Sequence, residues 1–270
     1  MAGFSVLSWN AQGIRHYAKT DFEKILPFLH SCASDVICLQ EMPEAKSKLA
    51  FLEKLEQYTS FIPKYNNPPS FGGNHNHNII LSRFPIEKSG EITFPEIINK
   101  QKLEGAIWAD ISINKIRLRI YNCHFGLFGF GFVERIRQLE IILKHALKFD
   151  GSTIICGDMN TTIPRHGLPR KIVQWFYKIP PGSMRYHNDY FEEDERYAFA
   201  GKAQEYGFTE AADIKKPTWS LPYINYELFN LKLDWFLIKY VQVNDICLGP
   251  YISDHRPISA ECFLKINKHL

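Results

Sequence analysis

The chain has 270 residues, 45% of them hydrophobic and 14% aromatic, and a formal net charge of +3 at pH 7. This size and composition predict one globular domain over residues 1–270 and exclude a disordered chain. The small positive charge permits a phosphate-bearing ligand but does not demonstrate one. No apolar run approaches the roughly 18 residues of a membrane-spanning helix, and no charged segment precedes an apolar run at the start. We therefore expect neither a transmembrane segment nor a signal peptide.

Six cysteines are scattered along the chain, and none forms the Cys-x-x-Cys pair that would suggest a zinc site. Cys38, Cys123 and Cys156 lie in apolar runs, where cysteine is usually a small hydrophobic residue. We therefore expect free thiols and a cytoplasmic protein.

The first part of the chain alternates strand-like and helical patterns. Residues 4–10 and 35–41 have the pattern of strands. Between them, "TDFEKILPFLHSCA" has the apolar spacing of a helix, and Pro27 predicts that this helix is kinked or starts late. Residues 46–58 predict a second, amphipathic helix.

Strands dominate the middle of the chain. Residues 78–84 read as one strand, and residues 105–113 and 116–125 as two more. The last two are separated only by Asn114 and Lys115, which predicts a hairpin that turns at these residues.

The remaining segments combine both patterns. Residues 134–149 have a strong helical period, and "STIICGDMN" follows as a buried strand. Residues 178–230 are loop-rich, aromatic and polar. The other expected elements are a short helix at 171–177 and strands at 232–239 and 258–266.

This order of elements predicts an α/β layered sandwich with a mixed sheet at its core. Polar groups end several of the strands, and strand ends are where α/β proteins form their sites. These groups are Asn10, Glu41, Asn122 with His124, Asp158 with Asn160, and Asp254 with His255.

Taken singly, each of these groups also has an ordinary structural explanation. Glu41 can cap a following helix, and Asp158 with Asn160 can form a turn closed by a side-chain carboxylate. His124 can be a half-buried histidine with satisfied hydrogen bonds, and Asp254 can cap its own loop.

Taken together, the motifs are far more specific. The segments "SWN", "LQE", "NCH", "GDMN", "LDW" and "SDH" occur in this order between Ser8 and Pro257. This order resembles the endonuclease/exonuclease/phosphatase superfamily, the deoxyribonuclease I-like metal-dependent phosphoesterases. The resemblance implies a four-layered α/β/β/α sandwich of two mixed β-sheets flanked by helices.

The resemblance also implies a metal site. Asn10 and Glu41 match the metal-binding amide and carboxylate of the family's first two motifs, and Asp254 matches the acid that completes or neighbours that site. Carboxylate and amide oxygens are the ligands that Mg²⁺ or Mn²⁺ prefers, so we expect one of these ions as cofactor.

The "GDMN" motif carries the implied water activation. Asp158 matches the acid that positions and deprotonates the attacking water, and Asn160 the amide that holds a phosphate oxygen. On an extended backbone these two side chains would point to the same side. Gly157 would let backbone and substrate approach closely. Asn78, in "HNIILSR", fits an amide that supports the phosphate site.

Two histidines complete the implied catalytic set. His255 matches the histidine that contacts the scissile phosphate, and Asp234 the acid that orients it. His124, together with Asn122, matches a second histidine found in the nuclease and phosphodiesterase branches. We expect Asn122, Asn78 and Asn160 to bind the substrate.

Two further positions allow alternative interpretations. Arg135 and Gln138 share one face of the predicted helix, where they either buttress the site or are surface groups. Trp219, in "KKPTWS", packs either near the leaving group or in the core.

The leading hypothesis is a Mg²⁺-dependent phosphodiesterase, most simply a nuclease that acts on DNA or RNA. A phospholipid or sphingolipid head-group phosphodiesterase and an inositol-phosphate phosphatase remain alternatives. A catalytically silent phosphate-binding module is disfavoured, because every charged position of the motifs is filled. We expect a phosphodiester substrate, nucleic acid before phospholipid, and no obligate protein partner.

Overall fold

A computed structural model describes residues 2–11, 22–42, 58–61, 77–94, 105–126, 132–160, 195–213, 215–219 and 231–264. The helix predicted at 171–177 and all but the last residue of the helix predicted at 46–58 lie outside these residues. Within the described ranges, no helix is long and apolar enough to cross a membrane.

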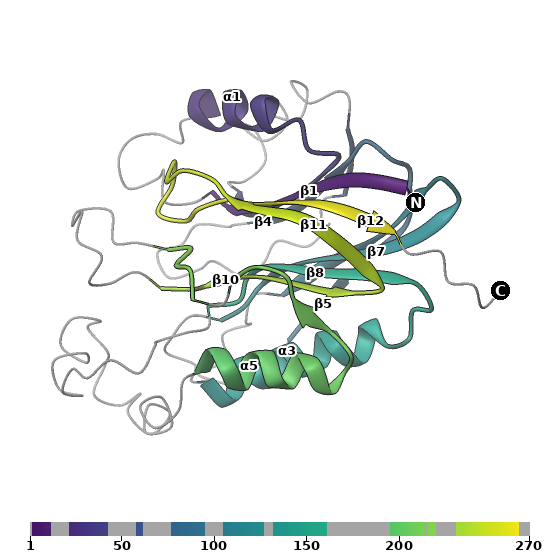
Figure 1. Cartoon of the computed structure of the whole chain (residues 1–270), viewed down its shortest axis with the longest axis vertical. Helices are drawn as coiled ribbons and strands as arrows, with labels where there is room; N and C mark the ends of the chain where they lie inside the picture. Colours follow the sequence, from purple (N-terminus) through teal and green to yellow (C-terminus); the bar gives the residue numbers. More distant parts are fainter. Residues whose placement is uncertain are drawn as a thin grey trace, which may run out of the picture.

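Two six-stranded β-sheets form the centre of the molecule (Figure 1). Sheet 1 has the order β11 (Val241–Leu248), β12 (Ile258–Leu264), β1 (Ala2–Asn10), β2 (Val36–Met42), β4 (His77–Ser82) and β3 (Thr59–Phe61). Sheet 2 has the order β5 (Ile86–Ile92), β6 (Ala106–Ile113), β7 (Ile116–His124), β8 (Ser152–Asp158), β10 (Asp234–Lys239) and β9 (Thr209–Glu210). The pairs β1/β2 and β7/β8 are parallel and the other pairs antiparallel, so both sheets are mixed.

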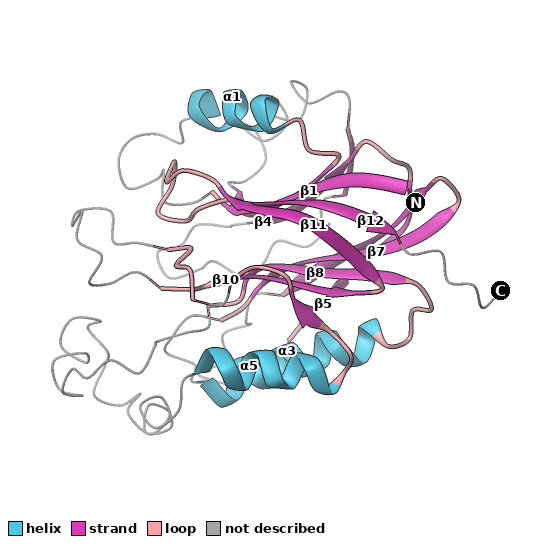
Figure 2. Ribbon diagram, in the orientation of Figure 1, coloured by secondary structure: helices cyan, strands magenta, loops and turns pink. Residues whose placement is uncertain are grey.

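Helices cover the two outer faces (Figure 2). Helix α1 (Phe22–Cys32) lies on sheet 1, and helices α3 (Phe132–Ala146) and α5 (Glu195–Glu205) lie on sheet 2. The layers therefore run helix, sheet, sheet, helix, which confirms the predicted four-layered sandwich.

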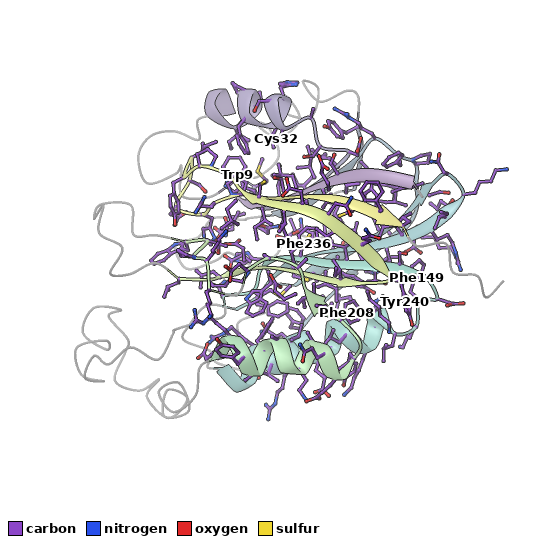
Figure 3. The ribbon with its side chains drawn as sticks, viewed as in Figure 1. Trp9, Cys32, Phe149, Phe208, Phe236 and Tyr240 are labelled. Carbon is purple, nitrogen blue, oxygen red and sulfur yellow. The ribbon has the colours of Figure 1, made fainter. Side chains whose placement is uncertain are left out.

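Apolar side chains fill each of the three spaces between these layers (Figure 3). In β8, Ile154 and Cys156 face sheet 1 while Ile155 faces α3 and α5. Side chains alternate along a strand, and here both faces are covered, so the strand is apolar throughout. In sheet 1, Trp9 packs beneath α1. Phe236 of sheet 2 lies between the two sheets.

The predicted hairpin is confirmed. β6 and β7 are joined at Asn114 and Lys115, whose φ angles of 51° and 68° are those of the tight turns that suit β-hairpins. Helix α1 starts at Phe22 and runs through Pro27, which lies exposed on its outer side.

Some elements differ from the sequence prediction. Helix α5 lies within residues 178–230, which were predicted as loop. It buries only Glu195, Phe199 and Ala203, a stripe too narrow and too polar to give a clear helical period. The charged edge strand β5 was not predicted either, and neither was β11, because their exposed faces break the apolar alternation that marks a half-buried strand.

Candidate active site

The polar groups that end the strands meet at one edge of the inter-sheet layer. Asn10, Glu41, His124 and Asp158 come from the carboxyl ends of the two parallel pairs, one pair in each sheet. Asp234 starts β10 beside Asp158, its partner in the antiparallel register, and His255 lies in the loop before β12. The two sheets therefore share one site.

Asn10 lies at the centre of this site. Its Nδ2 donates to Glu41 Oε1 at 3.1 Å and to Asp158 Oδ2 at 2.9 Å, which links the two sheets. His124 Nε2 lies 3.4 Å from Glu41 Oε1 and 3.7 Å from Asp158 Oδ2. Glu41, His124 and Asp158 each offer a ligand atom, and these atoms lie within 4.8 Å of one another. This cluster can hold a cation.

A β-bulge directs Glu41 into the site. In the register of β2 with β4, Leu39 pairs with Ile79 but Met42 pairs with His77, so β2 holds one extra residue. Glu41 lies in this extra step with a φ of 58°, a left-handed conformation that is uncommon for a residue other than glycine. Simple alternation would place Glu41 on the α1 side with Leu39, whereas the bulge re-aims its carboxylate toward Asn10.

Gly157 is required by the neighbouring strand, β7. It has a φ of 130°, and a Cβ atom here would lie 2.0 Å from the carbonyl oxygen of Cys123 in β7. This confirms the close approach of the backbone that the sequence predicted at Gly157, while the approach of a substrate stays a prediction. Gly157 lets β8 approach β7 closely at the point where His124 and Asp158 pair.

Asp158 and Asn160 form a turn that is closed by the Asp158 carboxylate. The sequence alone allowed this turn as the structural alternative to a catalytic role. Asn160, at a φ of 47°, donates its main-chain N–H to Asp158 Oδ1 at 2.9 Å and its Nδ2 to the carbonyl oxygen of Phe125 at 2.8 Å. The turn fixes one carboxylate oxygen and leaves the other facing Asn10 and the histidines. Burial raises the pKa of Asp158 above its usual range.

His255 and Asp234 form a buried pair next to Asp158. His255 Nδ1 lies 2.9 Å from Asp234 Oδ2, and its Nε2 lies 3.6 Å from Asp158 Oδ2. Burial lowers the pKa of His255, but the attraction of Asp234 and Asp158 for the imidazolium is larger in sum and raises it to about 10. His255 is therefore a cation near neutral pH, with its Nε2 directed into the site.

Asp254 directly precedes His255 in the chain and is held by Trp219. It is half-buried, and its Oδ2 accepts a hydrogen bond from Trp219 Nε1 at 3.1 Å. Its Oδ1 is buried and has no hydrogen-bond partner among the described residues. Trp219 also pairs with His255 through an isolated β-bridge, so it lies at the site and not in a remote part of the core.

Comparison with known proteins identifies the family. A model of the Endonuclease/Exonuclease/phosphatase family matches residues 7–255. The chain belongs to this family. It is thus a phosphoesterase-type hydrolase, as the six motifs implied.

Solved structures of endonuclease/exonuclease/phosphatase proteins share the fold at low sequence identity. One from Beutenbergia cavernae is 16% identical with a TM-score of 0.72, over 98% of this chain and 72% of that one. TDP2 from D. rerio, complexed with a single-strand DNA product, is 18% identical with a TM-score of 0.64, over 97% and 100%. ANGEL2, a 2′,3′-cyclic phosphatase, is 13% identical with a TM-score of 0.67, over 98% and 96%. Curated proteins give no match.

In this phosphoesterase, three amide side chains form a layer directly beneath the site. We call Gln40, Asn78 and Asn122 the amide layer. Asn122 is fully buried, accepts from Gln40 Nε2 at 2.7 Å, and donates both amide hydrogens to the carbonyl oxygens of Leu39 and Ile79 at 2.9 Å. Asn78 Nδ2 donates to the carbonyl oxygen of Gly105 at 3.3 Å.

The amide layer joins sheet 1 to sheet 2 and does not face the solvent. Asn122 and Asn78 therefore support the site from beneath. The substrate contact predicted for them stays a prediction. Gln40 was not predicted as part of the site. The available signal was a second polar residue in the apolar run "VICLQE".

Proposed function

We propose that this protein is a Mg²⁺- or Mn²⁺-dependent phosphodiesterase and, most simply, a nuclease. One observation carries the proposal. Asp158 Oδ2 lies between the cluster of Asn10, Glu41 and His124 on one side and the imidazolium of His255 on the other. A carboxylate in this position can take a proton from water between a cation site and a fixed positive charge.

The residues present fit a hard divalent cation. Glu41 and Asp158 offer carboxylate oxygens, and Asp254 Oδ1 is a buried oxygen with no hydrogen-bond partner in the described part of the chain. Glu41, Asn10 and Asp254 are the proposed ligands, which makes an oxygen-rich set of the kind that Mg²⁺ and Mn²⁺ prefer. Once bound, such a cation offsets the negative charge of a phosphodiester.

The chain's own residues divide the remaining work. Asp158 orients and deprotonates the attacking water, while its Oδ1 stays fixed by the N–H of Asn160. His255 donates from Nε2 to the developing charge on phosphorus oxygens, and Asp234 holds the proton on Nδ1. His124 and the Asn160 amide contact the phosphate from the β7 side.

Nucleic acid is the substrate class that we propose first. The support is indirect, since a structure of TDP2 with the same fold contains a single-strand DNA product. Phospholipid, sphingolipid and inositol-phosphate substrates are the competing outcomes. The six free cysteines also fit the proposed cytoplasmic location.

A substrate panel with a metal-site variant tests the proposal. The purified protein is incubated with Mg²⁺, Mn²⁺ or excess chelator and with single-stranded DNA, RNA, phospholipid vesicles or inositol phosphates. We expect cleavage of a nucleic acid that stops in chelator and is abolished in Glu41→Ala. Glu261→Ala removes an exposed carboxylate of β12 and is the matched control.

Full activity in chelator would contradict the metal dependence. Turnover of lipid or inositol phosphate alone would replace the nuclease assignment. No turnover of any substrate, with phosphate binding retained, would indicate a silent binding module.

A further inference from the structure

Helix α3 reaches the site through one buried side chain, Gln138. The residue is fully buried, and its Oε1 accepts the main-chain N–H of Gly126 at 3.1 Å. Gly126 lies two residues beyond His124 in the segment that leaves β7. Gln138 is therefore no surface group, although its helical spacing permitted that interpretation.

The segment held by Gln138 is the one that positions the "GDMN" turn. The N–H of Phe125 donates to the carbonyl oxygen of Asp158 at 2.9 Å, and the carbonyl oxygen of Phe125 accepts Asn160 Nδ2 at 2.8 Å. A continuous set of hydrogen bonds thus runs from Gln138 through Gly126 and Phe125 to both polar residues of the turn.

The amide nitrogen of Gln138 shows that this side chain does more than fill space in the core. Its Nε2 is buried and finds no hydrogen-bond partner in the described ranges. A buried donor without a partner costs free energy, which an apolar side chain of similar volume would avoid. The carboxamide thus fixes Gly126 through its oxygen, while its nitrogen costs stability.

Helix α3 is itself firmly placed. Arg135, one turn before Gln138, is fully buried and donates to Glu195 Oε2 of α5 at 3.0 Å. The Phe125 ring packs edge-on against Phe94 and Phe199 with centroid distances of 5.3 and 6.3 Å. Because α3 is held in place, its Gln138 can fix the position of the main chain at residues 125 and 126.

We propose that Gln138 is a positioning residue that sets Asp158 and Asn160 at the reacting phosphate by holding Gly126. This inference rests on the proposed function for its kinetic consequence only. Because the affected groups act at the scissile phosphate and not along the rest of the substrate, the effect falls on kcat more than on KM.

Three variants test this role. Gln138→Met removes both the acceptor and the unpartnered donor, so a residue that only packs would give equal or higher thermal stability and unchanged kcat. We expect equal or higher Tm but a kcat reduced about 10- to 100-fold, since small misplacements of reacting groups cost this much. Gln138→Glu keeps an acceptor and should retain more kcat than Gln138→Met. Gln204→Met, at an exposed glutamine of α5, is the matched control.

Hydrogen exchange gives a readout that does not need turnover. In Gln138→Met, the amide of Gly126 and that of Asn160 should exchange at least several-fold faster, while amides of β10 stay unchanged. If the wild type cleaves no substrate but this local increase appears, the proposed function fails and the positioning link stands. Unchanged exchange at Gly126 and Asn160, or unchanged kcat in an active enzyme, would overturn the proposal. A fall in Tm with faster exchange throughout the sheets would also overturn it.

Discussion

Two strand–helix–strand units build this site, one in each sheet. In the first, β1 and β2 are parallel and α1 crosses over the outer face, and in the second β7 and β8 are parallel and α3 crosses. Both units close in the same way just beyond the strands. The N–H of Ala11 donates to the carbonyl oxygen of Gln40 at 3.2 Å, and that of Phe125 to the carbonyl oxygen of Asp158 at 2.9 Å.

The two units differ in where the acid lies relative to the last paired residues of the parallel strands. In the second unit the acid belongs to the last pair, and in the first it comes one residue later. In the second, His124 lies directly opposite Asp158, and the strands reach this pair because Gly157 has no side chain. In the first, Asn10 lies opposite Gln40, and Glu41 comes one residue later through a bulge and a left-handed backbone. In the proposed mechanism, the same architecture thus offers the base Asp158 from one sheet and the cation ligand Glu41 from the other.

The largest expected effect separates these two acids. Asp158→Asn should lower kcat by about 10²–10⁴-fold, because it removes the proposed base. Added metal should not restore this loss, whereas Glu41→Gln should recover part of its activity in excess Mn²⁺. Metal titrations of both variants measure the difference, and full recovery of Asp158→Asn would assign Asp158 to the cation site instead.

For Asp158→Asn we can also predict the direction of the change in thermal stability. Burial raises the pKa of Asp158, so ionisation costs the folded state stability as pH rises through that pKa. Asp158→Asn should therefore not lower Tm at pH 7, and thermal unfolding at that pH checks this.

The next effect concerns the pair of Asp234, at the start of β10, and His255, in the loop before β12. His255→Ala should raise the activation barrier by about 2.7–4 kcal/mol, as for other lost electrostatic stabilisers. Asp234→Asn should be milder, because it loosens the imidazolium without removing it. The double variant should be little worse than His255→Ala alone, since the two act as a unit. Additive losses in kcat would show that they do not.

A smaller effect is expected from breaking the close approach of β7 and β8. Gly157→Ala should lower the free energy of unfolding by about 1–3 kcal/mol, because the new Cβ meets the main chain of Cys123. Gly201→Ala is the opposite case. It lies inside α5 with nothing within 4 Å of the added atom, so it should stabilise by roughly 0.5–1 kcal/mol. Chemical denaturation of both variants measures this contrast.

The smallest effect lies at the far end of the second unit, where α3 contacts β7 through a polar pair. Tyr121 Oη and His145 Nδ1 are 2.8 Å apart, and burial and Arg119 lower the pKa of His145. The folded protein therefore disfavours the imidazolium, and stability should fall as pH drops through about 6.5, the pKa of an unfolded histidine. The Tm gap between wild type and His145→Gln should narrow from pH 8 to pH 5. A constant gap would show that His145 does not contribute to acid sensitivity.

The sequence predicted those parts of the site that depend on local pattern. Asn10, Glu41, His124 and Asp158 each interrupt an apolar run at its end, which is visible without a structure. The close backbone approach at Gly157 was predicted, but its partner Cys123 was not, because that residue lies in another strand. The hydrogen bonds of Asn122 were not predictable for the same reason, since its partners Leu39 and Ile79 lie in the other sheet.

The prediction of the fold had a similar limit. Buried strands such as β2 and β8 carry their own signal, whereas edge strands and α5 are defined by the neighbours that they contact. The bulge at Glu41 shows this most clearly, because it appears only in the pairing of β2 with β4.

The position of β1 has a consequence for synthesis of the protein. β1 lies between β2 and β12, and Val6 pairs with both Val36 and Ala260. During translation, β1 and β2 can pair early, but the other edge of β1 stays open until β12 leaves the ribosome. His255 precedes that strand by only a few residues. A ribosome-bound nascent chain should thus stay inactive until β12 can pair with β1, because His255 reaches the site only with that strand.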